Sequence, residues 1–168
     1  MSYIDLLDKT KKKKILNLVE EEYGISELPH LFIKSGKDKI RIFSGSLSKE
    51  ELNTLAKTIH VDSIGIKMLT LEKFNSKESL RLSFDILNMP GIKEQITKNF
   101  IEINQEQLNT WLKGDNIILT KKEIEEFKEL NSEFIIIKHE DDFFGIAKNQ
   151  ISQGFLKNYV PKERRLRN

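Results

Sequence analysis

Cysteine is absent from all 168 residues of the chain. This absence excludes disulfides, thiolate zinc sites, iron–sulfur clusters and cysteine nucleophiles. A protein without disulfides is consistent with a reducing compartment, and we therefore expect a cytoplasmic location.

Long apolar runs are also missing, because the longest extend over only a few residues. A helix needs about 20 mainly apolar residues to span a bilayer, so we expect no membrane partner. The first residues, Met1 to Asp5, lack the charged region and the apolar stretch that form a secretory signal.

Motifs for common cofactors are missing as well. Gly145 and Gly154 stand alone, so there is no Gly-rich strand-to-helix turn for S-adenosylmethionine or a dinucleotide, and no phosphate-binding loop. Cytosine-5 methylation proceeds through a cysteine bonded to the base, and this chain has none. We therefore expect no cofactor and no enzymatic activity of the chain itself, pseudouridine synthesis included.

The three histidines, His30, His60 and His139, form no i, i+4 pair with another metal ligand, and we expect no metal site. The run from His139 to Asp142 offers an acid and a base, or a cation site, to a small hydrolase. It also falls between two apolar segments, and a charged hairpin tip is the simpler interpretation.

The chain does contain many charges, which are unevenly distributed. Hydrophobic residues make up 38% and charged residues 32%, as in a globular protein with a heavily charged surface. Residues 157–168 carry a net charge of +4, whereas the whole chain carries +2. The cations of this stretch are Lys157, Lys162, Arg164, Arg165 and Arg167. Clustered cations beside an aromatic and an amide indicate a surface for phosphates and bases, the alternative being a solvated basic tail.

The first half mixes helices with strands. Apolar spacing predicts a helix over 11–23 ended by Gly24, and Ser48 with Glu51 predicts a capping box at the start of a second helix. Alternation of apolar and polar residues predicts a strand over 80–86. Further strands are predicted over 31–33, 40–43 and 64–68, the first two as a hairpin. The pattern is interrupted at Met89-Pro90-Gly91, and we place a domain boundary between there and Asn99.

The second half consists mainly of short strands. Asn104 with Gln107 predicts a capped helix ending near Trp111, whose side chain we place in the core. A second helix is predicted over 121–130. Strands are predicted over 100–103, 117–119, 134–137 and 143–147. The resulting fold class is α+β, with an α/β module in residues 1–95 and a small β-barrel in residues 96–168.

This second half resembles a PUA domain, a small RNA-binding barrel. The resemblance is carried by Phe100 to Trp111, the turn Leu112 to Ile117, the strand Phe134 to Lys138, and Phe143 to Lys148. The closing stretch Gly154 to Lys162 resembles most the PUA-like C-terminal region of Nop/Sun RNA cytosine methyltransferases. The charged segment Lys121 to Leu130 departs from the pattern, since many PUA domains have an apolar, Pro-Gly-containing lead-in to a strand there.

The first half is similar to the pre-PUA domain of the "nuclear import protein seven" type of ribosome-biogenesis factor. That similarity is carried by Ile40 to Phe43, the helix after Ser48, Ile64-Gly65, and Leu80 to Phe84.

Both resemblances imply that the chain binds RNA. Lys157, Lys162, Arg164 and Arg165 are the candidates for phosphate contacts, which position RNA without specifying sequence. Asn158 is the candidate for a base edge, and Tyr159 for stacking on an unpaired base, unless Tyr159 lies in the barrel core. Lys113 beside Gly114 lies at a turn where the backbone can approach a ligand closely.

We thus predict a non-catalytic RNA-binding protein that acts on rRNA or tRNA. It would take part in ribosome biogenesis and rRNA processing, or serve as the RNA-binding partner of an RNA-modification enzyme. A methyltransferase or a ribosome-assembly protein is then the expected protein partner. The alternative is a protein-interaction module in which the α/β half recruits partners and the basic end only solubilises the chain.

Overall fold

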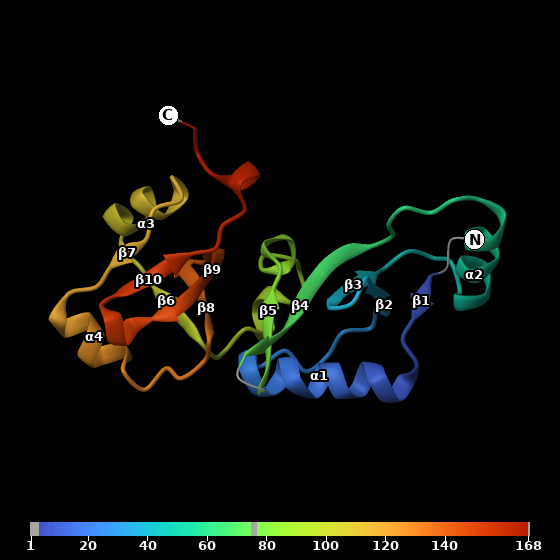
Figure 1. The fold of residues 1–168 in the computed structure, drawn as a ribbon, viewed down its shortest axis with the longest axis horizontal. Helices are drawn as coiled ribbons and strands as arrows, with labels where there is room; N and C mark the ends of the chain where they lie inside the picture. Colours follow the sequence, from blue (N-terminus) through green and yellow to red (C-terminus); the bar gives the residue numbers. More distant parts are fainter. Residues whose placement is uncertain (1–3, 75–76, 168) are drawn as a thin grey trace.

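Two five-stranded sheets form the framework of the protein in the computed structural model, which describes residues 4–74 and 77–167 (Figure 1). The N-terminal sheet has the order β1-β2-β3-β4-β5 and is antiparallel throughout. Its elements are β1 (Asp5–Leu6), α1 (Lys9–Tyr23), β2 (Leu31–Ser35), β3 (Lys39–Phe43), α2 (Lys49–Thr58), β4 (Ile66–Phe74) and β5 (Lys77–Leu82). Asn75 and Ser76, predicted as part of a turn, lie outside the described residues, as does Asn168.

The helices of this part begin and end where local signals place them. The Asp8 side chain accepts a hydrogen bond from the backbone N–H of Lys11 at 2.8 Å and caps α1. Gly24 ends that helix in the left-handed conformation, with φ of +88°. At α2, Ser48 and Glu51 form the predicted capping box. The helix end at Gly24 and the capping box of α2 are confirmed, whereas α1 begins at Lys9 and not at the predicted Lys11, because Asp8 caps it there.

The predicted strand over 80–86 is wrong in its second half. The strand β5 ends at Leu82, and a 3-10 turn, η1 (Phe84–Ile86), follows it. The physical reason is Ser83, whose hydroxyl accepts a hydrogen bond from the N–H of Asp85 at 3.4 Å and starts the turn. Strand β4 likewise begins at Ile66 and not at Ile64, because Gly65 has a φ of +73°, outside the β region.

The C-terminal sheet has the order β6-β8-β9-β10-β7 and is curled into a half-barrel. Strand β6 pairs with β8 in parallel, and the remaining described pairs are antiparallel. Its strands and helices are β6 (Phe100–Glu102), α3 (Gln105–Leu112), β7 (Ile117–Ile118), α4 (Lys121–Phe127), β8 (Phe134–His139), β9 (Asp142–Gln150) and β10 (Phe155–Asn158). Short 3-10 turns complete the set: η2 (Lys93–Gln95), η3 (Ile151–Gln153) and η4 (Lys162–Arg164).

The short strands and the capped helix α3 of this half agree with the prediction, whereas the cap of α4 was not predicted. Asn104 and Gln107 form a capping box on α3, and Thr120 with Glu123 forms another on α4, which ends at Phe127 and is shorter than predicted. Trp111 is fully buried, as predicted, and its indole N–H donates to the carbonyl of Phe144 at 2.7 Å.

The two sheets share part of one hydrophobic core. Tyr23 of α1 and Ile86 of η1 cluster with Phe134 and Ile136 of β8. The side chain of Asn88 reinforces the contact, because it donates to the carbonyl of Phe143 at 2.7 Å and accepts from its N–H at 2.9 Å. Within the described residues, no helix is both long and apolar enough to cross a membrane. The division at residue 95 stays a prediction.

Candidate nucleic-acid interface

Gly114 and Arg165 lie against each other, although more than two thirds of the domain separates them in the sequence. Gly114 follows the end of α3 with φ of +96°, and a Cβ at this position would come within 2.5 Å of Arg165 Cδ. The guanidinium Nε of Arg165 donates to the carbonyl of Val160 at 2.9 Å. Leu166 adds a backbone bond to the carbonyl of Leu112 at 2.8 Å. The basic end of the chain is therefore docked on the turn after α3 as far as Leu166.

Asn158 does not offer its side chain to a base, and this part of the prediction needs correction. The side chain is 9% exposed, and its amide donates to the carbonyls of Trp111 at 2.8 Å and Asp115 at 3.0 Å. Its carbonyl oxygen accepts from the N–H of Val160 at 2.8 Å. All its polar capacity is thus used to hold the turn after α3 against the end of β10.

Tyr159 occupies the junction between the two sheets and is half-buried. Its ring packs edge-on against Phe134, with centroids 5.8 Å apart. Two cations lie near the same ring: the guanidinium of Arg81 from β5 at 5.4 Å and the ammonium of Lys157 at 6.0 Å. Tyr159 therefore packs in part on the core, and its stacking on a base stays a prediction.

Arg164 extends the basic segment toward the N-terminal sheet. Its guanidinium lies 2.6 Å from the carboxylate of Asp85 and 5.8 Å from the ring centroid of Phe84. Both partners belong to η1 or its immediate surroundings, so this cation bridges the two parts of the chain. Both partners of this ion pair are substantially exposed, and such pairs contribute little to stability.

Lys113, Lys157, Lys162 and Arg164 are the exposed cations of the predicted set. Lys113 lies beside Gly114 at the end of α3, Lys157 on β10, and Lys162 on η4. The structure therefore brings all predicted residues to two adjoining segments, 111–116 and 157–166. Whether these residues contact RNA stays a prediction. Sequence reasoning placed Arg81 on the polar face of a strand but missed its contact with Tyr159, which joins residues far apart in the sequence.

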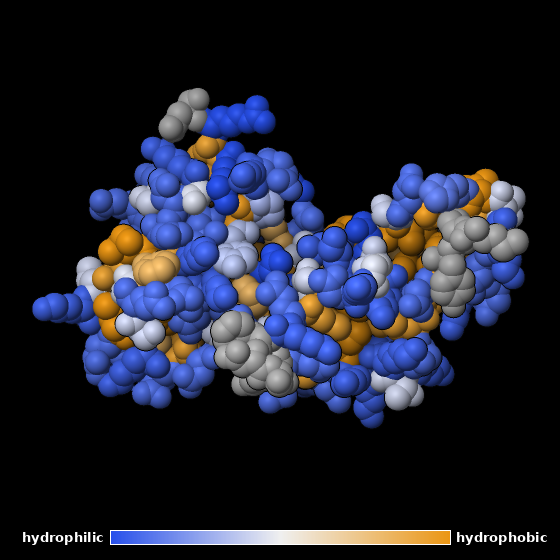
Figure 2. Space-filling model, viewed as in Figure 1, coloured by the Kyte–Doolittle hydropathy of each residue, from blue (hydrophilic) through white to orange (hydrophobic). Residues whose placement is uncertain are grey.

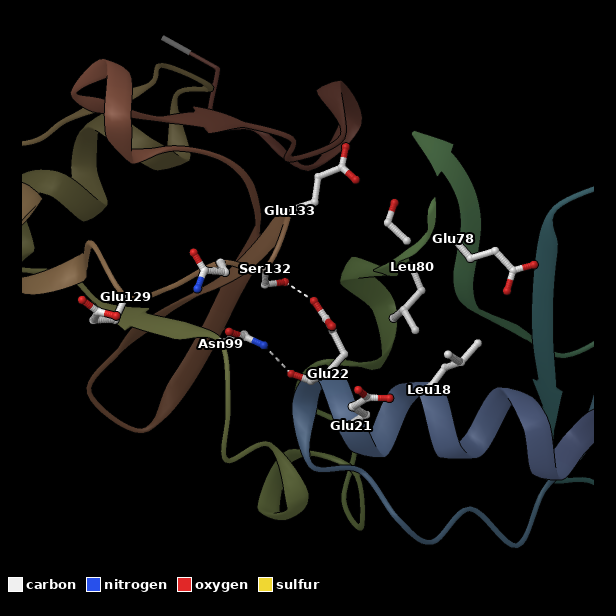
Figure 3. A pocket seen from close by; sticks show the side chains of 11 residues that line it. Leu18, Glu21, Glu22, Glu78, Leu80, Asn99, Glu129, Ser132 and Glu133 are labelled. Atoms are coloured by element: carbon white, nitrogen blue, oxygen red, sulfur yellow. Dashed lines mark hydrogen bonds between the residues drawn. The ribbon is translucent and has the colours of Figure 1, made fainter. Parts of the chain in front are cut away.

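A large acidic cavity lies on another side of the junction and was not predicted. Its volume is about 660 Å³, and α1, β5 and the segment before β8 line it (Figure 3). Five glutamates contribute to it: Glu21, Glu22, Glu78, Glu129 and Glu133. Glu22 is held in place by the hydroxyl of Ser132, and its backbone carbonyl accepts from the amide of Asn99 at 2.6 Å. Carboxylates repel phosphates, so we do not expect RNA on this side.

The charged residues His139 to Asp142 lie at the tip of the hairpin β8–β9, where His139 is paired with Asp142. Glu140 takes the left-handed conformation at the tip, with φ of +50°, and Asp142 pairs with Lys93 at 2.6 Å. In the described part of the chain, no three His, Asp or Glu side chains are grouped so as to hold a metal ion.

Comparison with known families supports the interpretation of the C-terminal half. Residues 98–166 match the family described as the methyltransferase RsmF PUA domain. The matched residues comprise the whole C-terminal sheet and the docked basic segment. The chain therefore carries a PUA-like domain, related to one found in RNA methyltransferases, and such a domain suggests RNA binding.

No curated protein matches the chain. The match to the family begins at residue 98, so it does not extend to the first half of the chain. The similarity of that half to the "nuclear import protein seven" type stays a prediction.

Proposed function

We propose that the protein is a non-catalytic RNA-binding protein that acts on rRNA or tRNA, in ribosome biogenesis or beside an RNA-modification enzyme. The observation that carries the proposal is the docking of Arg165 on Gly114, which gathers the exposed Lys113, Lys157 and Lys162 around one rigid part of a PUA-like domain. Cations held on a rigid scaffold lose less side-chain and backbone entropy on binding than those of a loose tail.

The chemistry of base modification supports a binding role for these residues. Covalent attack on cytosine requires a thiolate, and the chain has no Cys. In a complex with a modification enzyme, this chain would supply RNA contacts and its partner the reacting groups. The partner is then a methyltransferase or a ribosome-assembly protein.

A fluorescence anisotropy titration with labelled single-stranded RNA tests the RNA binding. About four phosphate contacts would give a slope of log affinity against log salt near −3. The double variant Lys157→Gln/Lys162→Gln removes two exposed cations and should reduce the magnitude of this slope by about 1.4. Its matched control is Lys121→Gln/Lys122→Gln on α4, which changes the net charge equally. Absence of binding to any RNA at low salt would contradict the proposal.

The RNA itself is identified by crosslinking the protein to cellular RNA and sequencing the attached fragments. Enrichment of rRNA favours a role in ribosome assembly, whereas enrichment of tRNA favours a role beside a tRNA-modification enzyme. Recovery of no RNA above a control would count against both.

A protein-interaction module is the second candidate, and one observation favours it. Leu47 and Ile59, at the two ends of α2, are 37% and 53% exposed. A cavity of about 380 Å³ opens beside them, lined by Leu47, Glu50, Glu51, Thr54, Leu55 and Thr58. Apolar surface at the α2 end of the molecule is visible in Figure 2. This function requires no cation of the basic segment, so changing Lys157, Arg164 and Arg165 to Ala would leave it intact.

A further inference from the structure

One face of the N-terminal sheet carries a row of polar and cationic side chains. Lys39 of β3 is paired with Thr70 of β4, and Thr70 is paired with Arg81 of β5. Because directly paired residues project to the same side of a sheet, the three side chains lie in one row. Arg41 and Lys67 form the next pair along β3 and β4. We call the charged residues of this side, Lys39, Arg41, Lys67, Glu72 and Arg81, the cationic face. Thr70, between Lys39 and Arg81, is buried beneath it.

The opposite side of the same strands is apolar and covered. Ile40 is paired with Leu69, and Leu69 with Leu82, and all three are buried in the core together with Val19 of α1. Helix α2 packs instead on the side of Ile33 in β2, through Leu52 and Ala56. The cationic face therefore lies beside α2 and away from α1. Figure 2 shows the outline of the molecule hollowed on this side, between the C-terminal half and α2.

Positive charge prevails on the cationic face. Its residues include four cations and one carboxylate, Glu72, which lies 2.8 Å from Arg81 Nε. Arg41 donates to the carbonyls of Ile64 at 2.8 Å and Gly65 at 2.6 Å, so hydrogen bonding fixes its guanidinium without neutralising it.

Lys67 shows how close these cations lie to one another. Partial burial lowers the pKa of Lys67, and the charges of Arg81 and Lys39 lower it further, against the opposing effect of Asp38 and Asp85. Cations crowded in this way are unfavourable in the free protein, and an anion placed between them relieves the repulsion.

The cationic face is continuous with the predicted RNA-binding residues of the PUA-like domain. Arg81 is the connection, since its guanidinium lies 5.4 Å from the ring centroid of Tyr159 and 5.7 Å from that of Phe134. Lys157 lies on the other part of the same Tyr159 ring. Arg164 reaches toward Asp85, close to the end of β5. Adjacent strands are about 4.8 Å apart, so the row from Arg81 to Lys39 extends the surface by about 10 Å.

The acidic cavity limits where a polyanion can cross the junction. It lies between α1 and β5, where Glu78, Ser79 and Leu80 line it, whereas Arg81 does not line it. A negatively charged strand is repelled from the cavity and attracted to the cationic face.

We propose that single-stranded RNA bound by the PUA-like domain continues across the junction onto the cationic face, passing Arg81 beside Tyr159 and placing phosphates near Lys67 and Lys39. This inference rests on the RNA binding proposed above and extends it to the first half of the chain. The contacts are made to phosphates, so this part of the surface adds affinity and not sequence specificity.

The test compares two labelled single-stranded RNAs of about 5 and about 15 nucleotides, binding to the full chain. The double variant Lys39→Gln/Lys67→Gln removes two charges but keeps side chains of polar character. We expect it to weaken binding of the longer RNA and to reduce the magnitude of its salt slope by about 1.4. Binding of the shorter RNA, which the PUA-like domain accommodates alone, should remain unchanged.

The matched control is Lys13→Gln/Lys34→Gln, which changes the net charge equally on α1 and β2. Lys13 is exposed on α1, and Lys34 is paired with Ile40, so it projects to the α1 side of the sheet. The single variant Lys39→Gln, at an exposed position, should reduce the magnitude of the slope by about half as much. It leaves the half-buried Lys67 unchanged, so its result does not involve any loss of packing at that residue.

Equal salt slopes for the two double variants with the longer RNA would overturn this inference and leave the proposed RNA binding intact. Failure of the unaltered chain to bind either RNA at low salt would contradict the proposed function, and the inference with it.

Discussion

The hydroxyl of Tyr23 donates a hydrogen bond to the carbonyl of Phe134 at 3.1 Å, and so joins α1 to β8 across the boundary between the two sheets. The carbonyl of Leu80 in β5 lies 3.4 Å from the same oxygen. Tyr23 is fully buried, and burial raises its pKa, so the hydroxyl stays protonated and remains a donor at neutral pH. One buried phenol thus connects three elements that hold the two halves in register.

Removing this hydroxyl should weaken the whole protein. Tyr23→Phe keeps the ring but leaves the Phe134 carbonyl without this partner, which should lower the free energy of unfolding by about 1–2 kcal/mol. Urea denaturation measures the change. Tyr159→Phe is the control, because its hydroxyl forms no hydrogen bond within the described residues. Equal stability of the two variants would show that the Tyr23 bond contributes nothing.

Replacing Gly114 and Gly91 in turn should distinguish the effect of backbone strain from the effect of displacing Arg165. Gly114→Ala and Gly91→Ala both place a Cβ on a backbone with positive φ, +96° and +81°, and each should cost about 1–2 kcal/mol of stability. The new Cβ meets Arg165 only at Gly114, since nothing lies within 4 Å of a Cβ at Gly91. RNA affinity, measured by anisotropy, should therefore fall in Gly114→Ala alone. An equal affinity in both variants would refute a role for the docked Arg165.

Changes at Asn158 should affect stability first. Asn158→Ala removes three buried hydrogen bonds and should cost about 2–3 kcal/mol. Asn158→Asp directs a carboxylate at the carbonyls of Trp111 and Asp115. At neutral pH it should therefore lower the stability at least as much as Asn158→Ala does. Protonation of the Asp side chain at lower pH restores a donor. The difference in melting temperature between the Asp variant and the unaltered protein should therefore become smaller at lower pH. Full stability combined with lost RNA binding would instead indicate a base-reading side chain.

Glu123 should make stability depend on pH in the acidic range. Partial burial acts to raise the pKa of Glu123, but the backbone N–H of Thr120 and the amide of Gln107, 2.8 Å away, hold it below the ordinary value. A carboxyl group whose pKa is lower in the folded than in the unfolded protein stabilises the fold at pH values above its unfolded pKa of about 4.3. This stabilisation is lost as the pH falls through the pKa of the group in the folded protein. Glu123→Gln should therefore destabilise the protein at pH 7 and not at pH 3.

Urea denaturation at both pH values measures this effect. The control is Glu126→Gln, an exposed position on the same helix, which should change stability little at either pH. If Glu123→Gln lowers the free energy of unfolding by the same amount at both pH values, the charge of Glu123 is not the cause.

Several features were predictable because their cause is local. The capping boxes at Ser48 and Asn104 require only residues three positions apart, and the structure contains both. The hairpin of β8 and β9 follows from two apolar runs around an acidic turn.

Other features were not predictable because a competing interaction decides them. Leu80, Leu82, Phe84 and Ile86 alternate as in a strand, but the hydroxyl of Ser83 turns the chain after Leu82. Asn158 stands among cations in the sequence as a base-reading residue would, yet its position at the end of β10 directs it inward to three backbone groups. Local sequence does not reveal which side of a short strand will be covered.

The sequence by itself determined the mixed α/β class, the capping boxes at Ser48 and Asn104, the basic character of the last residues and the PUA-like nature of the second half. Only the tertiary structure decided which residues the cations contact. Arg81 lies beside Tyr159, and Arg165 lies on Gly114, because the two sheets share the core around Phe134 and Ile136. Periodicity and capping are set by neighbours along the chain, whereas a binding surface depends on packing between segments that are far apart in it.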